Sequence, residues 1–245
     1  MDGRRETCCN SGNFDVINPA QVVSDLTSSD PTGRLMKISD SAKLAILHGL
    51  VDGDVAEFGI STGVSWEVLA ATIAACETSK NTRGLPPKTL YGFDSFRGMP
   101  EAKLPEDTES PMVQRGIWRP GSCISPGKEA IRSIAIKYLP VERVQLYKGW
   151  FSETLYTTPP LLKFCCVHID CDFYESTAQV LEFLFETDRL SDGCIVLFDD
   201  FLESRGSKKL GQRRAWIECV EKYAPDYTDL GYYGIASWRC IIHRD

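Results

Sequence analysis

Four aspartates directly follow two apolar runs in the second half of the chain, and they are its strongest chemical feature. Asp170 and Asp172 follow the run FCCVHI, and Asp199 and Asp200 follow the run CIVLF. If the two runs are neighbouring strands, their ends lie about 4.8 Å apart, so four carboxylates would converge at one edge of a sheet. Like charges this close raise one another's pKa and destabilise the fold unless a cation neutralises them. A hard divalent ion bound through oxygens would do so, and Mg²⁺ is the expected occupant.

Other interpretations of these acids remain open at this point. Asp172 or Ser176 could cap a following helix, while Asp199 and Asp200 could lie in a solvated turn. The DxD spacing of Asp170 and Asp172 also occurs in glycosyltransferases, where it holds a metal and a nucleotide diphosphate. Haloacid-dehalogenase-type phosphatases use it too, with the first Asp as nucleophile. Neither of these two enzyme classes explains the acidic residues that follow two earlier apolar runs.

The first of those runs ends in AEFGISTG, which holds Glu57, Gly59 and Gly63 where a strand is expected to turn into a helix. Glycine at such points lets the backbone approach a ligand closely. The spacing is not GxGxxG and no Walker lysine follows, so cradles for NAD or ATP phosphates are disfavoured. Asp94 ends the next run, which is the usual place for a carboxylate that binds ribose hydroxyls. A tight structural turn and a helix cap are the alternatives for these two sites.

The elements that must position these residues alternate along the chain between strand and helix patterns. Strands are expected at residues 55–60, 89–93, 144–147, 164–169 and 194–198. Helices are expected at 34–50, 64–76, 130–138, 176–189 and 209–224. Residues 227–233 and 235–243 resemble a closing hairpin. We therefore predict an α/β fold with one doubly wound, mostly parallel sheet and an antiparallel C-terminal strand.

The domain organisation and the composition narrow the class of protein. Residues 1–33 are polar and are expected to form a flexible tail or lid, and 34–245 a single domain with a long, functional loop at 97–127. With 27 Lys and Arg against 34 Asp and Glu, the net charge is −7, which argues against a nucleic-acid surface. No apolar run is long enough for a membrane span, and no signal peptide is recognisable. Ten cysteines without a CxxC pair favour a reducing, cytoplasmic location over a zinc site.

Taken together, the motifs resemble those of the macrocin O-methyltransferase family across residues 35–243. The matching segments are VAEFG and GVS in 55–65, YGFDSFRGMP at 91–100, KGWFSETL at 148–155, HIDCDFYEST at 168–177 and FDD at 198–200. The resemblance implies a Rossmann-like class I methyltransferase domain that uses S-adenosylmethionine and magnesium. It also implies a small hydroxylated acceptor, such as a sugar on a macrolide or an aminocoumarin, and a homodimer.

The same resemblance implies roles for individual residues. Cofactor-binding roles fall on Glu57, Gly59, Gly63, Ser65, Asp94, Ser95, Gly149, Phe151 and Asp170. The first three match the motif that faces the methionine part of the cofactor, and Asp94 and Ser95 match its ribose and adenine side. Magnesium ligands fall on Asp170, Asp199 and Asp200, and the general base on Asp172. The loop that covers the acceptor contains Trp118, Gly121 and Ser122.

The chemistry that this resemblance implies is methyl transfer to a hydroxyl group. Magnesium would bind two neighbouring acceptor oxygens and favour the alkoxide, while Asp172 would take the proton. His168 shares a face with Asp170 in the expected strand, and a buried structural role is favoured for it over that of a base. A catechol-type acceptor would satisfy the same metal geometry. A non-catalytic cofactor-binding protein on the same fold is the alternative from another class.

Overall fold

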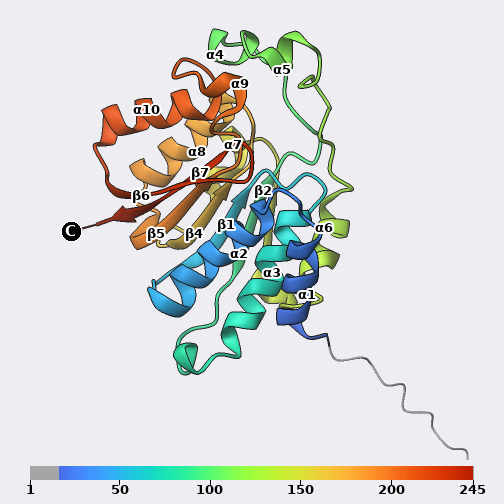
Figure 1. Ribbon diagram of the computed structural model, residues 1–245, viewed down its shortest axis with the longest axis vertical. Coiled ribbons are helices and arrows are strands. Elements are labelled where there is room, and N and C mark those ends of the chain that lie inside the picture. Colours follow the sequence, from blue (N-terminus) through green and yellow to red (C-terminus); the bar gives the residue numbers. More distant parts are fainter. Residues whose placement is uncertain (1–16, 245) are drawn as a thin grey trace, which may run out of the picture.

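Seven strands form one sheet in the order β3-β2-β1-β4-β5-β7-β6 (Figure 1). The computed structural model describes residues 17–244. Strands β1 to β5 are parallel, and β7 runs antiparallel to both of its neighbours. The predicted doubly wound sheet with an antiparallel C-terminal strand is confirmed. The strands are β1 (Asp54–Phe58), β2 (Leu90–Asp94), β3 (Val144–Lys148), β4 (Phe164–Ile169), β5 (Leu190–Phe198), β6 (Asp226–Tyr233) and β7 (Ser237–His243).

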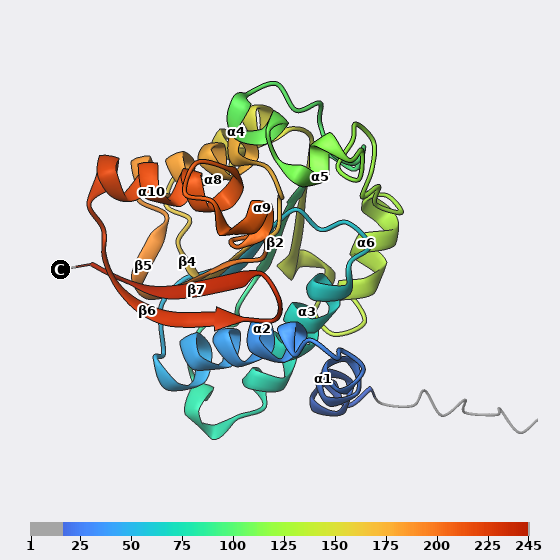
Figure 2. The same ribbon diagram turned by 45° about the horizontal axis from the view of Figure 1, so that its top comes forward.

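Helices cover both faces of this sheet (Figure 2). One face carries α2 (Arg34–Lys43), continued by a π-helical turn at Leu44–His48, with α3 (Val64–Glu77) and α6 (Lys128–Ala135). The other carries α7 (Phe151–Thr154), α8 (Tyr174–Glu186) and α10 (Gly211–Tyr223). The short helices α4 (Pro105–Thr108), α5 (Pro111–Gln114) and α9 (Glu203–Gly206) lie beyond one end of the sheet (Figure 1).

The strands are apolar because both of their faces are buried. Val55 packs under α2 and α3, whereas Phe58 points to the opposite face and stacks on Phe93 with ring centroids 4.7 Å apart. Glu57 and His168 break this apolar pattern, although both are fully buried. They are paired in the β1–β4 register and lie on the face that α2 covers. A buried acid and a buried histidine each need hydrogen-bond partners. The residues around the candidate active site provide these partners.

The structure differs from the sequence prediction at the N-terminal end. Residues Pro19–Ser28 form the helix α1, which packs against α3, where a flexible tail or lid up to residue 33 was expected. Asn18 caps this helix, since its Oδ1 accepts from the backbone N–H of Ala20 at 3.1 Å, and Pro19 suits its first turn. The rest of the predicted tail, residues 1–16, lies outside the described part of the chain. Within residues 17–244 no helix is long and apolar enough to cross a membrane.

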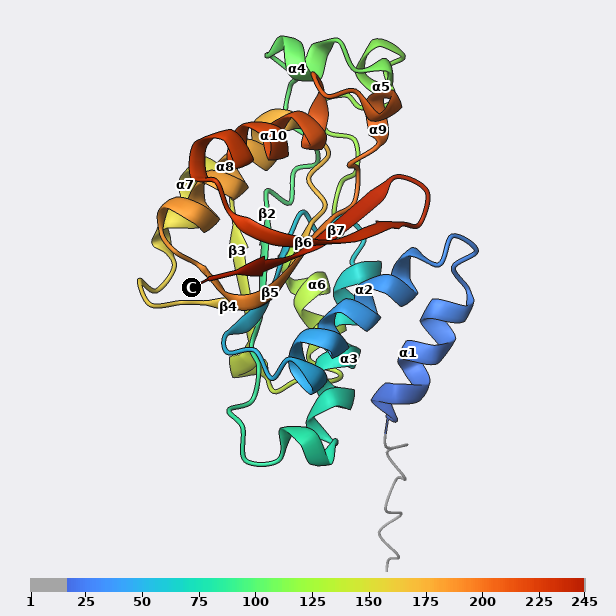
Figure 3. The ribbon, with the colours of Figure 1, turned by 60° about the vertical axis from the view of Figure 1, so that its left-hand side comes forward.

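The predicted closing hairpin is confirmed as β6 and β7, and its turn reaches the start of α2 (Figure 3). Gly234 in this turn has φ +58°, and a Cβ atom there would lie 3.2 Å from Cβ of Arg34. The turn therefore lets the side chain of Arg34 pass across it. Just after the turn, the hydroxyl of Ser237 donates to the backbone oxygen of Asp199 at 2.8 Å. The last two strands thus contact the acidic end of β5.

Candidate active site

The ends of β1 and β4 meet where the strand order of the sheet reverses. Gly59 follows β1 with φ +86°, and a Cβ atom there would lie 1.8 Å from the backbone oxygen of Asp170 after β4. No other residue type tolerates both that φ and that approach. The reversal point of a doubly wound sheet is its usual ligand site. Gly59 thus permits a close approach between the segments after β1 and β4, and its predicted approach to a ligand stays a prediction.

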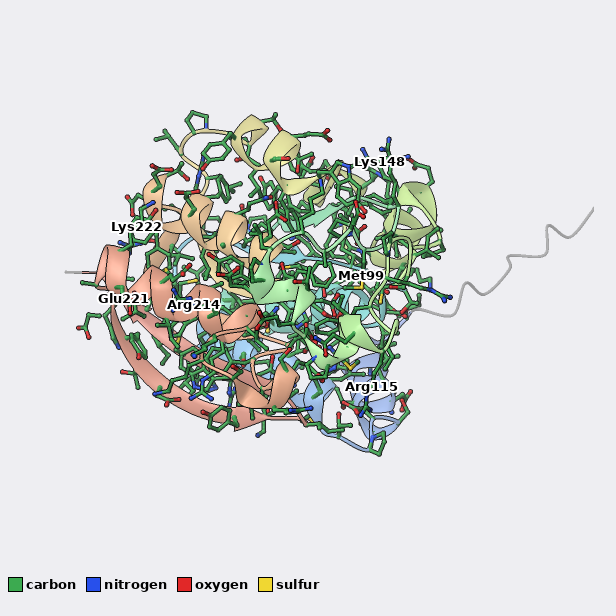
Figure 4. All side chains as sticks on the ribbon, turned by 90° about the horizontal axis from the view of Figure 1, so that it is seen from above. Met99, Arg115, Lys148, Arg214, Glu221 and Lys222 are labelled. Atoms are coloured by element: carbon green, nitrogen blue, oxygen red, sulfur yellow. The ribbon has the colours of Figure 1, made fainter. Side chains whose placement is uncertain are left out.

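A cavity of about 590 Å³ opens at this point, a volume within the usual range for small-molecule sites. Seen from above, Met99 of its rim lies on the same half of the molecule as Lys148 and Arg115, away from Arg214 and Glu221 of α10 (Figure 4). Most of the predicted site residues line it, namely Gly59, Ser65, Asp94, Ser95, Gly149, Phe151, Asp170, Asp172 and Asp199. Glu57, Gly63, Asp200 and the loop residues Trp118, Gly121 and Ser122 do not.

Gly63 and Glu57 do not line the cavity and instead contact other side chains of the protein. A Cβ atom on Gly63 would lie 2.8 Å from Cδ1 of Ile131, so this glycine permits α6 to pack against α3. Glu57 has no exposed surface, and its Oε1 lies 2.9 Å from Nδ1 of His168. The family resemblance placed both residues in the motif that faces the methionine part of the cofactor. Neither residue lines the cavity, although Thr62 and Val64 beside Gly63 do.

Asp94 lines the cavity and also holds the turn after β1. Its Oδ2 accepts from the backbone N–H groups of Ile60 and Ser61 at 2.7 and 3.1 Å, and its Oδ1 accepts from Phe96 at 2.6 Å. These bonds tie the end of β2 to the turn that forms the cavity floor. Asp94 therefore has a structural role in this turn, and its place on the cavity wall is compatible with the predicted ligand contact as well.

His168 bridges two acids of the site. Nδ1 faces Glu57, and Nε2 lies 3.4 Å from Oδ1 of Asp199. Burial by itself would lower the pKa of His168, but the hydrogen bonds to Asp199 and Glu57 outweigh it and raise the pKa to about 10. In the protonated form, which this shift favours, His168 donates to both acids. The predicted burial of His168 is confirmed, and its structural role stays a prediction.

Arg34 is the residue of the site that sequence reasoning missed. Its Nη1 lies 2.7 Å from Oδ2 of Asp199 and 3.5 Å from Oδ2 of Asp170. Burial alone would lower the pKa of Arg34, yet the charges of Asp199 and Asp170 raise it. Arg34 starts α2, and its side chain donates hydrogen bonds to two acids far along the chain. No motif could have marked it, because its contacts lie more than 130 residues away.

Asp172 and Asp200 have raised pKa values, unlike Asp199. Burial, followed by the negative charges of Asp199 and Glu203, raises the pKa of Asp172 to about 7. Burial and the charges of Asp172 and Asp170 raise the pKa of Asp200 well above its usual value. The Oδ2 atom of Asp200 is buried without a hydrogen-bond partner. These two acids therefore lack the positive neighbours that Asp199 has.

The alternative that Asp172 caps the next helix is wrong. Helix α8 has no cap from its own chain segment. Its first amides are bound by Asp107 of α4, whose oxygens accept from Tyr174 at 2.6 Å and from Glu175 at 3.2 Å. These two hydrogen bonds anchor the loop 95–127 to the start of α8. Trp118 from the same loop packs edge-on against Phe173, with ring centroids 5.8 Å apart.

The donor set at the strand ends suits a hard cation. Within residues 17–244, ligand atoms of His168, Asp170 and Asp199 lie within 4.8 Å of one another. Both nitrogens of His168 face carboxylates, so oxygens of Asp170 and Asp199 remain as the ligands of that group. Asp200 is not part of this group, although its Oδ2 is buried without a hydrogen-bond partner. Oxygens of this kind are the ligands that Mg²⁺ prefers.

Comparison with known proteins gives one family and several relatives. The profile of the family Macrocin-O-methyltransferase (TylF) matches residues 31–215. An 8-demethyl-8-(2,3-dimethoxy-alpha-L-rhamnosyl)-tetracenomycin-C 4'-O-methyltransferase of Streptomyces olivaceus is 30% identical over 157 residues, 64% of this chain and 56% of that protein. A demethyldecarbamoylnovobiocin O-methyltransferase of Streptomyces niveus is 28% identical over 158 residues, with the same coverage of both chains. The match to this chain thus spans about half the length of these curated relatives.

Two solved structures share the fold. The O-methyltransferase NovP superposes with a TM-score of 0.67 at 23% identity, covering 86% of this chain and 80% of its own. A calicheamicin methyltransferase superposes with a TM-score of 0.63 at 20% identity and covers 91% of both chains. The sheet order and these likenesses agree on a class I methyltransferase fold.

Proposed function

Because the chain belongs to the macrocin O-methyltransferase family, we propose that it transfers a methyl group from S-adenosylmethionine to a hydroxyl of a sugar-bearing metabolite, with a magnesium ion at the acidic strand ends. The observation that carries the proposal is the convergence of three features on one cavity. These are the turn after β1, the segment Gly149–Phe151 after β3, and the acids after β4 and β5. No single feature would suffice, since each also occurs in other α/β proteins.

The part of the cavity between β1 and β3 supports the cofactor assignment. Gly59, Ser65 and Asp94 border it on one side, and Gly149, Trp150 and Phe151 on the other. Gly149 has φ +149°, and a Cβ atom there would lie 2.9 Å from Thr154. Glycine here therefore lets this turn pack closely on Thr154, beside Trp150 and Phe151, which line the cavity. Gly59, Ser65, Asp94, Ser95, Gly149 and Phe151 are the residues we assign to S-adenosylmethionine, and Glu57 and Gly63 to positioning its binding turn.

Asp170, Asp199 and Asp200 are assigned to the magnesium ion. A bound divalent ion supplies Lewis-acid chemistry, which lowers the pKa of a hydroxyl group. His168 and Ser237 orient the carboxylate of Asp199, since each has a polar atom 3.4 Å from its Oδ1. Gln212 orients Asp200, because its Oε1 accepts from the Asp200 backbone N–H at 2.9 Å. These partners hold the acids with their oxygens toward the strand ends.

Asp172 is assigned the role of general base. It lines the cavity, and its pKa of about 7 suits proton transfer near neutral pH. Its φ of +59° places the side chain off the path of the strand that precedes it. The loop around Met99 and Trp118 lies above the site and is held by Asp107 and Phe173, so it can exclude water from an acceptor.

The acceptor class rests on the relatives. Both curated relatives carry names of O-methyltransferases, and the name of one specifies a rhamnosyl-bearing tetracenomycin as its substrate. A sugar with two neighbouring hydroxyls would fit the metal geometry, and so would a catechol. We expect the sugar to be preferred. The oligomeric state expected from family resemblance is a homodimer, which light scattering of the purified chain would check.

The test uses the full chain, methyl-labelled S-adenosylmethionine and a panel of acceptors. The panel contains glycosylated macrolides and aminocoumarins, the same compounds without their sugars, and simple catechols. Transfer to the glycosylated compounds alone, lost with EDTA and restored by Mg²⁺, would support the proposal. Transfer to catechols alone would replace the acceptor class. Failure to bind S-adenosylmethionine in a calorimetric titration would overturn the enzymatic proposal and leave a binding protein on this fold.

A further inference from the structure

One nitrogen atom occupies the space between the two carboxylates that face each other at the strand ends. Nη1 of Arg34 contacts Oδ2 of Asp199 and Oδ2 of Asp170. The side chain of Arg34 is held along its length, since its Cβ and Cγ pack over Gly234 of the β6–β7 turn. The contact is therefore a built part of the fold.

A divalent ion bound by the same two oxygens would need the same space. Carboxylate oxygens bind Mg²⁺ or Ca²⁺ at about 2.0–2.6 Å. The guanidinium nitrogen lies 2.7 Å from one of these oxygens and 3.5 Å from the other. An ion in contact with both would overlap this nitrogen, and the two positive charges would repel each other.

We propose that Arg34 is an internal substitute for the metal ion: it neutralises Asp170 and Asp199 until a divalent cation displaces it. The proposal rests on the metal site of the proposed function and adds a competitor to it. Cation binding is then an exchange of one positive group for another. The ion must therefore bind less tightly than the carboxylates alone would allow.

The fold gives the displaced side chain a place to go. Arg34 lines the cavity, and 27% of its side chain is exposed there. Rotation about its outer bonds would move the guanidinium into the cavity without moving α2. The last contact to break is with Asp199, which keeps His168 as its second positive partner. Asp170 is near the charge of His168 but shares no hydrogen bond with it, so we expect Asp170 to gain most from the ion.

The test measures binding of Mn²⁺ alone, by electron paramagnetic resonance of the free ion, and repeats it with Mg²⁺ by calorimetry. Arg34→Gln removes the charge and keeps much of the side-chain length. Lys37→Gln is the matched control, because Lys37 lies one turn along α2 and pairs with Asp40 on the surface. Asp170→Asn locates the bound ion, since it must weaken binding if the ion lies at this pair. None of these readouts requires catalysis.

We expect Arg34→Gln to bind Mn²⁺ about fivefold more tightly than the unmodified chain, the effect of losing one partly buried ion pair. Without metal, the variant should melt at a lower temperature, and Mn²⁺ should raise its Tm more than that of the unmodified chain. Lys37→Gln should do neither. Equal or weaker Mn²⁺ binding by Arg34→Gln overturns the competition while leaving the metal site intact. No binding by any form of the protein overturns the metal site itself.

Discussion

The partners of each acid at the site determine which chemistry it can perform. Burial alone would raise the pKa of Asp199, but the hydrogen bond and charge of His168, with the charge of Arg34, lower it. Burial, followed by the negative charges of Asp199 and Glu203, raises the pKa of Asp172. Asp199 therefore stays ionised while Asp172 can exchange a proton near pH 7. Paired acids with separated pKa values are typical of catalytic sites.

Replacement of this base should remove turnover and spare cofactor binding. We expect Asp172→Asn to lower kcat by about 10²–10⁴-fold, the usual contribution of general-base catalysis. The dissociation constant of S-adenosylmethionine, measured by calorimetry, should stay the same. Glu221→Gln on the far side of the molecule is the charge-matched control (Figure 4). Near-normal kcat in Asp172→Asn would show that another group accepts the proton.

Asp94 should affect stability as well as cofactor affinity. Asp94→Ala leaves three backbone N–H groups at the cavity floor without their acceptor. We expect the free energy of unfolding without ligand to fall by about 1–3 kcal/mol, the cost of unsatisfied buried donors. Urea unfolding measures this effect, and calorimetry should show weaker S-adenosylmethionine binding. Ser95→Ala, which removes a hydrogen bond to the Gly98 oxygen and one from the Arg97 N–H, is the milder comparison for stability. Unchanged stability would limit Asp94 to ligand contact.

At the level of elements, the loop 95–127 is fastened to the rest of the fold at a few defined points. Asp107 binds the first amides of α8, and Ser110 accepts a hydrogen bond from Ser204 of α9 at 2.8 Å. Trp118 packs on Phe173 directly after Asp172. The loop 95–127, which covers the cavity, therefore packs directly against the segment that contains Asp172.

Loss of the helix cap should loosen this cover. We expect Asp107→Ala to lower the free energy of unfolding by about 0.5–2 kcal/mol, as is usual for a lost N-cap. Amide hydrogen exchange should accelerate across 105–122, and the KM for the acceptor should rise more than that for S-adenosylmethionine. Glu109 is exposed and directly follows α4, the helix that contains Asp107. Glu109→Ala should show none of these changes. If amide exchange in 105–122 stays slow, the contacts of Ser110 and Trp118 are enough to hold the loop without Asp107.

The elements differ in how visible they are in the sequence. The strand predicted at residues 164–169 matches β4 to the residue, because a strand buried on both faces is a continuous apolar run. Helices α1, α4 and α5 were missed, since short helices with few apolar residues lack a helical period. The acids were recognisable because they follow apolar runs. Arg34, Asp107 and Gln212 were not, because only the fold brings them to the site.

Across the whole molecule, a row of alternating charges crosses the sheet from β1 to α2. Glu57, His168, Asp199 and Arg34 follow one another through contacts of 2.9, 3.4 and 2.7 Å. Three of the four come from different strands, and the fourth from the helix above them. This row joins the centre of the sheet to its helical layer through ionic contacts, within an otherwise apolar core.

The row should make stability depend on pH in a defined direction. The pKa of His168 is about 10 in the fold against an ordinary value of 6.5. Its contribution is therefore fully present below pH 6.5 and is lost as the pH rises toward 10. In urea unfolding with EDTA, the stability gap between the unmodified chain and His168→Asn should shrink over that window. A gap that stays constant from pH 6.5 to 10 would mean that His168 does not carry this charge.

The β6–β7 turn also bears on the order in which the protein can be made. Arg34 passes across Gly234 and binds Oδ2 of Asp199, and the hydroxyl of Ser237 lies 3.4 Å from Oδ1 of the same carboxylate. Until residues 226–243 have been translated, β5 is an exposed edge, this carboxylate lacks Ser237, and Arg34 lacks the turn that it crosses. The growing chain can form most of its sheet early, yet its acidic centre matures only after residues 226–243 emerge.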